Sequence, residues 1–150
     1  PPNRTPVGSA DNEPDEGWTP STKCQRGGLT DASMHYGEGL GYLKDAKHAF
    51  SESSWNRSVG HASTAAIHAS DSICLMRLGL FSTSHNHKHA PPILERAIPE
   101  NPELVADFVD LLDLKNPGQY ASRMLFEKDA RFCIDAAELL LQHAATLLPK

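Results

Sequence analysis

Residues 126–147 read FEKDARFCIDAAELLLQHAATL, and their apolar side chains recur at alternating intervals of four and three residues. Side chains at this spacing lie on one face of an α-helix, so the segment is predicted to be a helix with one buried face. The residues of this face are Phe126, Ala130, Cys133, Ala137, Leu140, Ala144 and Leu147.

Residues 59–80, VGHASTAAIHASDSICLMRLGL, repeat the spacing with mostly small side chains. Small side chains allow two helices to pack closely, so we expect these two helices to lie side by side. The second apolar face consists of Val59, Ala62, Ala66, Ala69, Ile73, Met76 and Leu80.

Caps and breakers divide the rest of the chain into further helices. The predicted ranges are 30–51, from a cap at Thr30 or Asp31; 55–79, from Trp55 or Asn56 to a stop at Gly79; 93–98; 103–114; and 119–148. The last is expected to be the longest and to form the spine, and residues 81–92 are expected to be a loop. The predicted fold class is therefore all-α, a four- to five-helix antiparallel bundle.

The first predicted helix has two notable features. Its inner face is expected to carry Tyr36, Leu40, Leu43, Ala46 and Phe50. Gly37, Gly39 and Gly41 weaken its middle by about 1 kcal/mol each relative to alanine. They therefore indicate either close approach of another element or a poorly formed first turn.

The N-terminal segment 1–28 is rich in Pro, Gly, Ser, Asn and Asp and is predicted to be a disordered tail. Its Trp18 is expected to be solvent-exposed, with docking on the folded part as the alternative. Residues 29–150 then form one helical domain, a size that can build a core without disulfides or metal.

Composition limits the classes of function. The chain has 150 residues, 22% of them charged, and a formal net charge of −5, which disfavours bulk electrostatic binding to DNA or RNA. No apolar run approaches the ~20 residues that span a bilayer, and the N-terminus does not resemble a signal peptide. Cys24, Cys74 and Cys133 are odd in number and widely spaced, so reduced packing cysteines and a cytoplasmic location are expected.

Three local stretches, in this order, resemble the HEPN superfamily of helical bundles. They are the alanine-rich segment 62–71 (ASTAAIHASD), the histidine-bearing link 85–90 (HNHKHA) leading into Ile93-Leu94, and the segment 111–120 (LLDLKNPGQY) before the last helix. The resemblance covers about residues 29–148.

Many HEPN proteins are ribonucleases that pair an arginine with a histidine, with four to six residues between the two, and these residues meet across a dimer. In this chain Ser58, Val59 and Gly60 alone separate Arg57 from His61, and Arg77 is too far from His85. The resemblance therefore implies a non-nuclease branch, such as an accessory partner of a nucleotidyltransferase or a nucleotide- or RNA-binding module. A toxin–antitoxin or phage-defence setting is usual for such proteins.

Arg57 and His61 are nevertheless the candidate catalytic residues. Four residues apart on one helix, they share a face and could supply a cation and a general acid–base at a scissile phosphate. The alternative is an ordinary solvent-exposed helix surface.

The candidate binding residues are His85, His87, His89, Lys115 and Tyr120. Lys115 could reach a phosphate and Tyr120 could stack on a base, although a tyrosine at this position more commonly anchors the helix start against the core. Two of the loop histidines with Asp71 or Glu95 could hold a metal ion, but alternate histidines on an extended loop point to opposite sides. His68 and Asp71, three residues apart, favour an interhelical hydrogen bond over an active site. Neither a cofactor nor a bound metal is expected.

We therefore expect a non-catalytic HEPN-like module that works by binding protein, nucleotide or RNA. We expect it to be a homodimer formed through the small-residue faces of the helices at 55–79 and 119–148. The alternatives are a divergent metal-independent ribonuclease using Arg57 and His61, and a metal-binding protein using the histidine loop.

Overall fold

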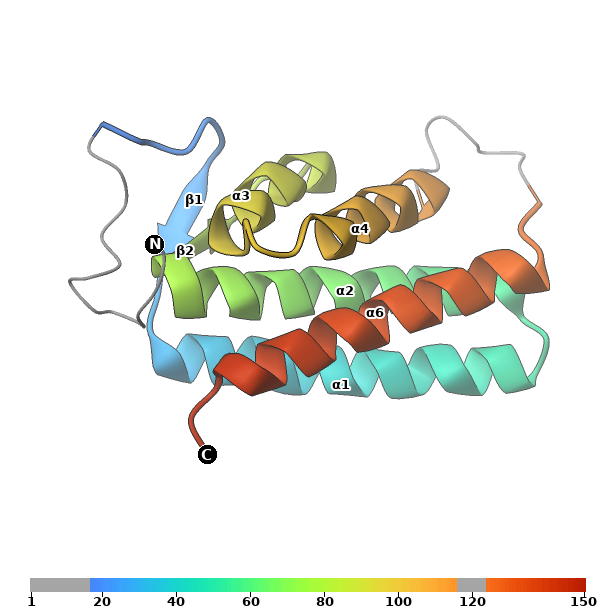
Figure 1. The fold of residues 1–150 in the computed structure, drawn as a ribbon. Helices are drawn as coiled ribbons and strands as arrows, with labels where there is room; N and C mark the ends of the chain where they lie inside the picture. The colour runs from blue at the N-terminus through green and yellow to red at the C-terminus, as the bar shows by residue number, and fades with distance from the viewer. Residues whose placement is uncertain (1–16, 116–123) are drawn as a thin grey trace.

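The computed structural model describes residues 17–115 and 124–150. Its elements, in chain order, are β1 (Cys24–Arg26), α1 (Leu29–Ser51), α2 (Trp55–Leu78), β2 (Leu80–Ser82), the 3-10 turn η2 (His87–His89), α3 (Ala90–Ala97), α4 (Pro102–Lys115) and α6 (Glu127–Leu147). Figure 1 shows them as a helical bundle, which confirms the predicted fold class.

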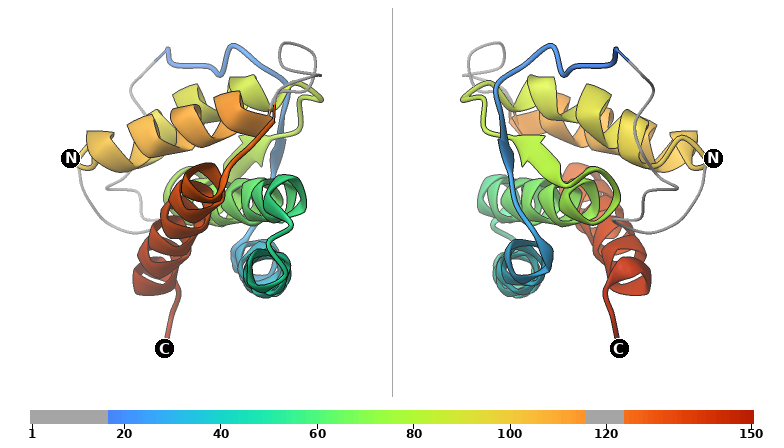
Figure 2. Two further views of the ribbon diagram at one scale, coloured as in Figure 1. Left: turned by 90° about the vertical axis from the view of Figure 1, so that its right-hand side faces the viewer. Right: turned by 90° about the vertical axis from the view of Figure 1, so that its left-hand side faces the viewer.

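Helix α2 lies at the centre of the bundle. Helix α1 runs antiparallel along one side of it, α3 and α4 lie on the opposite side, and α6 crosses against α1, α2 and α4 (Figures 1 and 2). The prediction that the last helix is the longest element and the spine is wrong, because α2 has 24 residues and α6 has 21. Small side chains on several faces of α2 let it contact all the other helices.

The two apolar faces read from the sequence are buried, as predicted. Ala62, Ala66, Ala69 and Ile73 on α2 are fully buried, and so are the α6 residues from Ala130 to Ala144 that belong to its face. Phe126 is exposed, at 54%, because it is the residue before the first turn of α6, and Met76 and Leu147 of these faces are half-buried. These faces pack within one chain, so the prediction that a homodimer uses them is wrong.

The predicted inner face of α1 is confirmed at Leu43 and Ala46, which are buried, and Tyr36 and Phe50 are half-buried against the core, but it is wrong at Leu40. Small residues dominate the buried face, and Leu40 is 44% exposed; the buried residues are Ala32, Gly39, Leu43, Ala46 and Ala49. A Cβ atom on Gly39 would lie 2.8 Å from Leu141 Cδ2 and 3.3 Å from the Ala65 carbonyl oxygen. Close approach is thus confirmed at Gly39, whereas Gly37 and Gly41 face open space.

Two buried serines hold α2 against α1. The Ser58 hydroxyl donates to the Ala46 carbonyl at 2.9 Å, and the Ser72 hydroxyl donates to the Ala32 carbonyl at 2.8 Å. These hydrogen bonds lie near opposite ends of the helix pair and fix its register. The middle of α1 is therefore held opposite the middle of α2.

The segment before α1 is more structured than predicted. Strand β1 pairs antiparallel with β2, with Gln25 opposite Phe81. Trp18 is half-buried against the core, and the Arg96 guanidinium lies 4.6 Å from its ring centroid. The expected disordered tail therefore does not extend to residue 28, and Trp18 docks rather than being solvent-exposed; residues 1–16 lie outside the described range.

Two predicted boundaries also change. The expected loop 81–92 contains β2 and η2, and α3 begins at Ala90, since Pro91 and Pro92 fit its first turn. The last helix starts at Glu127, where the Asp129 carboxylate accepts a hydrogen bond from the Phe126 amide at 2.8 Å. Residues 119–123 of the predicted helix lie outside the described part of the chain. None of the described helices is long and apolar enough to cross a membrane.

The cysteines are free, as predicted, and two of them are core residues. Cys74 and Cys133 are buried, and Cys24 is half-buried on β1. Burial raises the pKa of the Cys133 thiol to about 12 and raises that of Cys74 further. Both thiols are therefore protonated packing groups.

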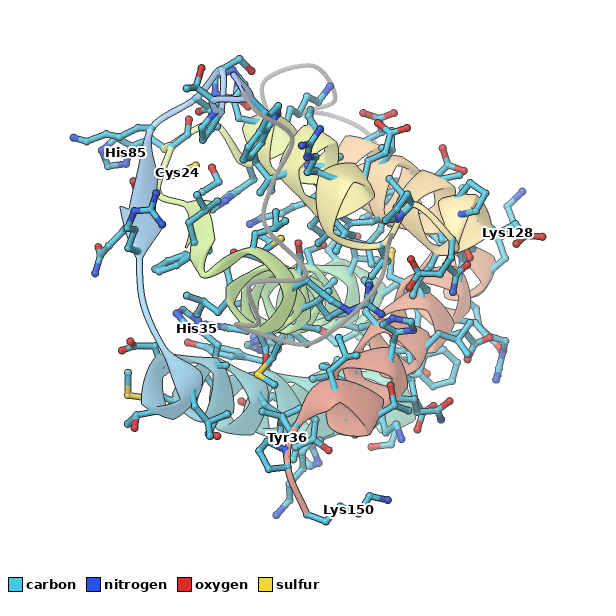
Figure 3. All side chains as sticks on the ribbon, turned by 60° about the vertical axis from the view of Figure 1, so that its left-hand side comes forward. Cys24, His35, Tyr36, His85, Lys128 and Lys150 are labelled. Atoms are coloured by element: carbon cyan, nitrogen blue, oxygen red, sulfur yellow. The ribbon has the colours of Figure 1, made fainter. Side chains whose placement is uncertain are left out.

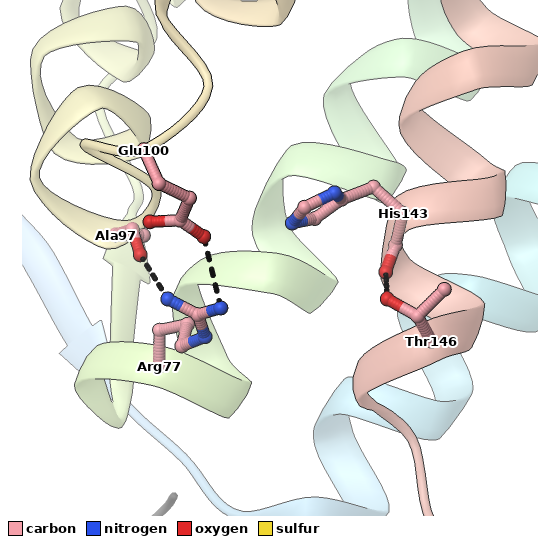
Figure 4. Close-up of polar contacts among 5 residues, drawn as sticks. All are labelled: Arg77, Ala97, Glu100, His143 and Thr146. Carbon is pink, nitrogen blue, oxygen red and sulfur yellow. Dashed lines mark hydrogen bonds and ion pairs between the residues drawn. The ribbon is translucent and has the colours of Figure 1, made fainter. Parts of the chain in front are cut away.

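Arg77 ties α2 to the end of α3 (Figure 4). Its guanidinium donates to the Ala97 carbonyl at 3.0 Å and pairs with Glu100 at 3.0 Å. We expect Arg77→Met, which keeps the aliphatic stem, to lower the free energy of unfolding by about 1–2 kcal/mol in urea titrations. Lys47→Met is the control, because it removes an exposed ion pair with Glu138 and should change stability by less than about 0.5 kcal/mol. Equal effects of the two variants would contradict this role.

Candidate functional site

Three polar side chains meet between α1 and α2. His35 Nδ1 lies 3.0 Å from His68 Nδ1 and 3.8 Å from Asp71 Oδ2, and one ligand atom from each residue lies within 4.8 Å of the others. His68 and Asp71 are three residues apart on α2 and share a face, and α1 supplies His35 from the opposite side (Figure 3). We call these three residues the His–His–Asp cluster.

Burial dominates the electrostatics of this cluster. Asp71 is 7% exposed, and burial raises the pKa of its carboxyl to about 8. Burial also lowers the pKa of His35, although Asp31 and Glu38 oppose the shift. Burial and then His35 lower the pKa of His68, against Glu38. Near neutral pH both imidazoles are therefore neutral, and one ring nitrogen can donate to the other.

Aromatic rings extend the cluster along the α1–α2 face. Tyr42 stacks on His68, with centroids 5.6 Å apart and planes at 10°, and on His61 at 6.4 Å and 28°. Phe81 of β2 contacts His35 edge-on at 4.9 Å. We call His35, His68, Tyr42 and His61 the ring row; all four side chains are half-buried.

The predicted catalytic residues lie at the far end of the ring row. Arg57 is exposed in the first turn of α2, and His61 lies one turn further on, against Tyr42. The row thus has a cation at its Arg57 end, whereas at the other end Asp31 and Glu38 lie within electrostatic range of His35, and Glu38 also of His68. Arg57 and His61 are four positions apart on α2, about 6 Å along the helix axis.

The predicted binding histidines of the loop separate into two groups. His89 Nδ1 is hydrogen-bonded to Ser84 Oγ at 2.8 Å and to Thr22 Oγ1 at 3.2 Å, so it holds the loop to the segment before β1. His87 lies within electrostatic range of His85 and Lys115, since burial and then those two groups lower its pKa. Burial also lowers the pKa of Lys115. Tyr120 lies outside the described residues.

The histidine loop does not form the metal site that was one alternative. Among the described residues, His35, His68 and Asp71 are the group of three metal-ligating side chains whose ligand atoms come close enough to share an ion. Asp71 lies with His35 and His68 rather than with the loop. In the loop, His89 is instead hydrogen-bonded to Ser84 and Thr22.

No family model and no curated protein matches the sequence. Function is therefore inferred from the geometry of the described residues.

Sequence reasoning missed His35 and Tyr42 as site residues. It noted the three-residue spacing of His68 and Asp71 and predicted an interhelical hydrogen bond, which the contact between His68 and His35 confirms. The missing signal was the helical line His35, Gly39, Tyr42 and Ala46, which marks the side of α1 that faces α2. The small residues on that line, Gly39 and Ala46, identify the close contact between the helices. His35 and Tyr42 lie on the same line, next to this contact.

Proposed function

We propose that this chain is a non-catalytic helical module, HEPN-like in architecture, that binds a nucleotide or a short single-stranded RNA segment on the α1–α2 face. The observation that carries the proposal is the stack of Tyr42 with His61 and His68, which ends at the exposed Arg57. Aromatic rings beside a cation are the elements by which proteins hold single-stranded nucleic acid. One nucleotide spans the distance from His61 to Arg57.

Charge supports a small ligand over a duplex. The net charge of −5 repels a long polyanion, and the acidic residues Asp31 and Glu38 lie near the His35 end of the ring row. A phosphate is therefore favoured only near Arg57, with the base on the exposed edge of the His61–Tyr42 stack.

We expect Tyr42→Ala to weaken binding of a fluorescein-labelled five-nucleotide single-stranded RNA about tenfold. Loss of one stacking contact is worth about 1–3 kcal/mol, and the tyrosine also positions both histidines. Fluorescence anisotropy at fixed salt concentration measures the effect. Tyr42→Phe keeps the ring and should bind like the parent protein.

Arg57→Ala should weaken the same interaction and flatten its salt dependence, because one phosphate contact is lost. Lys47→Ala is the matched control, since this exposed cation pairs with Glu138 of α6. Absence of binding by the parent chain, or equal affinity of the Tyr42 and Arg57 variants with it, would refute the proposal.

The same RNA incubations separate the module from the ribonuclease alternative. We expect no cleavage that depends on Arg57 and His61, because one exposed arginine and a stacked histidine are the whole of that candidate active site. Cleavage that is lost in the Arg57→Ala, His61→Ala double variant would favour the nuclease instead.

Partners belong to the same proposal. A nucleotidyltransferase or another protein, a second copy of the chain, and a toxin–antitoxin or phage-defence setting follow from the HEPN resemblance. A second copy would need a surface other than the alanine faces of α2 and α6, which are buried inside the chain.

A further inference from the structure

The His–His–Asp cluster contains a buried carboxyl group whose nearest charged or polar contact is weak. Asp71 is 7% exposed, and its oxygen lies 3.8 Å from His35 Nδ1, beyond hydrogen-bond distance. Buried polar groups are normally hydrogen-bonded, and buried charges are normally paired or bound to metals. Asp71 thus occupies a position that a bound cation would satisfy.

The distances in the cluster fit a small ion. A tetrahedral zinc site with bonds of about 2.0–2.1 Å places its ligand atoms about 3.3 Å apart. The two measured separations from His35 Nδ1, 3.0 Å to His68 and 3.8 Å to Asp71, lie on either side of this value. All three ligand atoms lie within 4.8 Å of one another, so side-chain rotations that draw the widest pair together would complete the three-ligand arrangement.

The fold holds these ligands in place before any ion binds. The hydrogen bonds from Ser58 and Ser72 fix the register of α1 against α2, and Gly39 permits the close approach. Tyr42 stacks on His68 and Phe81 contacts the edge of His35, so both imidazoles are held by packing. Ligands held in place by rigid helices and by packing against neighbouring rings are typical of preorganised metal sites.

We propose that His35, His68 and Asp71 bind one divalent transition-metal ion of the zinc class between α1 and α2. Two imidazoles and one carboxylate are ligands that zinc and its neighbours accept, whereas magnesium and calcium prefer all-oxygen sites. Three protein ligands leave a fourth position for water. The site goes beyond nucleotide recognition, because its α2 ligands His68 and Asp71 lie about 16 and 21 Å along the helix from Arg57.

The test uses the full chain, free of any histidine tag and stripped with a chelator. Titration with Zn²⁺ against a chromophoric chelator should show one tight site per chain, and Co²⁺ should give the visible absorption of a four- or five-coordinate site. We expect Asp71→Asn, His35→Gln and His68→Gln each to weaken zinc binding by at least about 100-fold, since removal of even an outer-shell partner costs 10–100-fold.

The controls separate this site from the loop and from misfolding. His87→Gln should leave zinc affinity unchanged, and circular dichroism should show parental helix content for Asp71→Asn, which keeps the side-chain shape. Zn²⁺ should raise the melting temperature of the parent chain and of His87→Gln but not that of the three cluster variants. Absence of tight binding by the parent chain would overturn the proposal, and so would binding lost in His87→Gln but kept in the cluster variants.

Discussion

Asp71→Asn should make the metal-free protein more stable by about 4 kcal/mol at pH 7. The carboxyl is buried, and its pKa is raised from 3.8 to about 8, so folding at neutral pH requires the group to take up a proton. That uptake costs about 1.4 kcal/mol per pH unit above the unfolded pKa. An asparagine has the same shape and no proton to bind, so it avoids the cost.

The sign of this effect predicts its pH dependence. The folded chain holds the Asp71 proton between pH 3.8 and about 8 whereas the unfolded chain releases it, so the contribution of Asp71 to stability falls as the pH rises through this window. Below pH 3.8 the parent chain and the variant should be equally stable, and the difference should be complete near pH 8. Urea unfolding at several pH values, with a chelator present, measures it. A constant difference at all pH values, or a variant less stable than the parent chain at pH 7, would contradict burial of this group.

Gly39→Leu should destabilise the protein by about 2–3 kcal/mol. Even a Cβ atom at this position would lie 2.8 Å from Leu141 of α6 and 3.3 Å from the Ala65 carbonyl of α2. A leucine must therefore push α1 away from both helices, and overpacking of this kind typically costs 1–3 kcal/mol. Urea titrations followed by circular dichroism give the free energy of unfolding.

Gly37→Leu is the matched control for the same helix. Gly37 is exposed and has no atom within 4 Å of its Cβ direction, so a leucine there should stabilise α1 by up to about 1 kcal/mol through helix propensity. The two variants should thus differ in sign. If both variants left the free energy of unfolding unchanged, this would contradict the close packing of α1, α2 and α6 at Gly39.

The helices of this protein could be predicted from the sequence because periodic apolar residues and caps act locally. Gly79 ends α2 in the left-handed conformation, with φ of 72°, where glycine is favoured. The predicted face of α1 was wrong at Leu40 because the prediction weighted large residues, whereas the close contact also selects the small residues Ala32 and Gly39. The strands were missed because three residues carry no measurable alternation.

The candidate site could be predicted only in part, because it depends on a contact between residues far apart in the sequence. His68 and Asp71 are three residues apart, so their spacing was visible. His35 is 33 residues from His68, and its position depends on the register that Ser58 and Ser72 fix between the helices. The loop histidines drew attention because they are close together in sequence, yet His89 binds Ser84 and Thr22 instead.

The two proposals place ligands of opposite charge at opposite ends of the α1–α2 face. Arg57 and the His61–Tyr42 stack would take a phosphate and a base, and the His–His–Asp cluster would take a cation. The sites share Tyr42, which stacks on both His61 and His68. Zinc affinity and RNA affinity can nevertheless fail independently, since Arg57→Ala leaves the three metal ligands intact.

X-ray absorption spectroscopy of the zinc-loaded full chain reports most directly on the His–His–Asp cluster. We expect a first shell of nitrogen and oxygen atoms at about 2.0–2.2 Å, with the outer-shell scattering of two imidazoles and no sulfur. Cys74 and Cys24 are the competing ligands. Asp71 lies within electrostatic range of Cys74, and so does Cys24. A zinc–sulfur distance of about 2.3 Å, or a shell without imidazole scattering, would contradict binding by His35, His68 and Asp71.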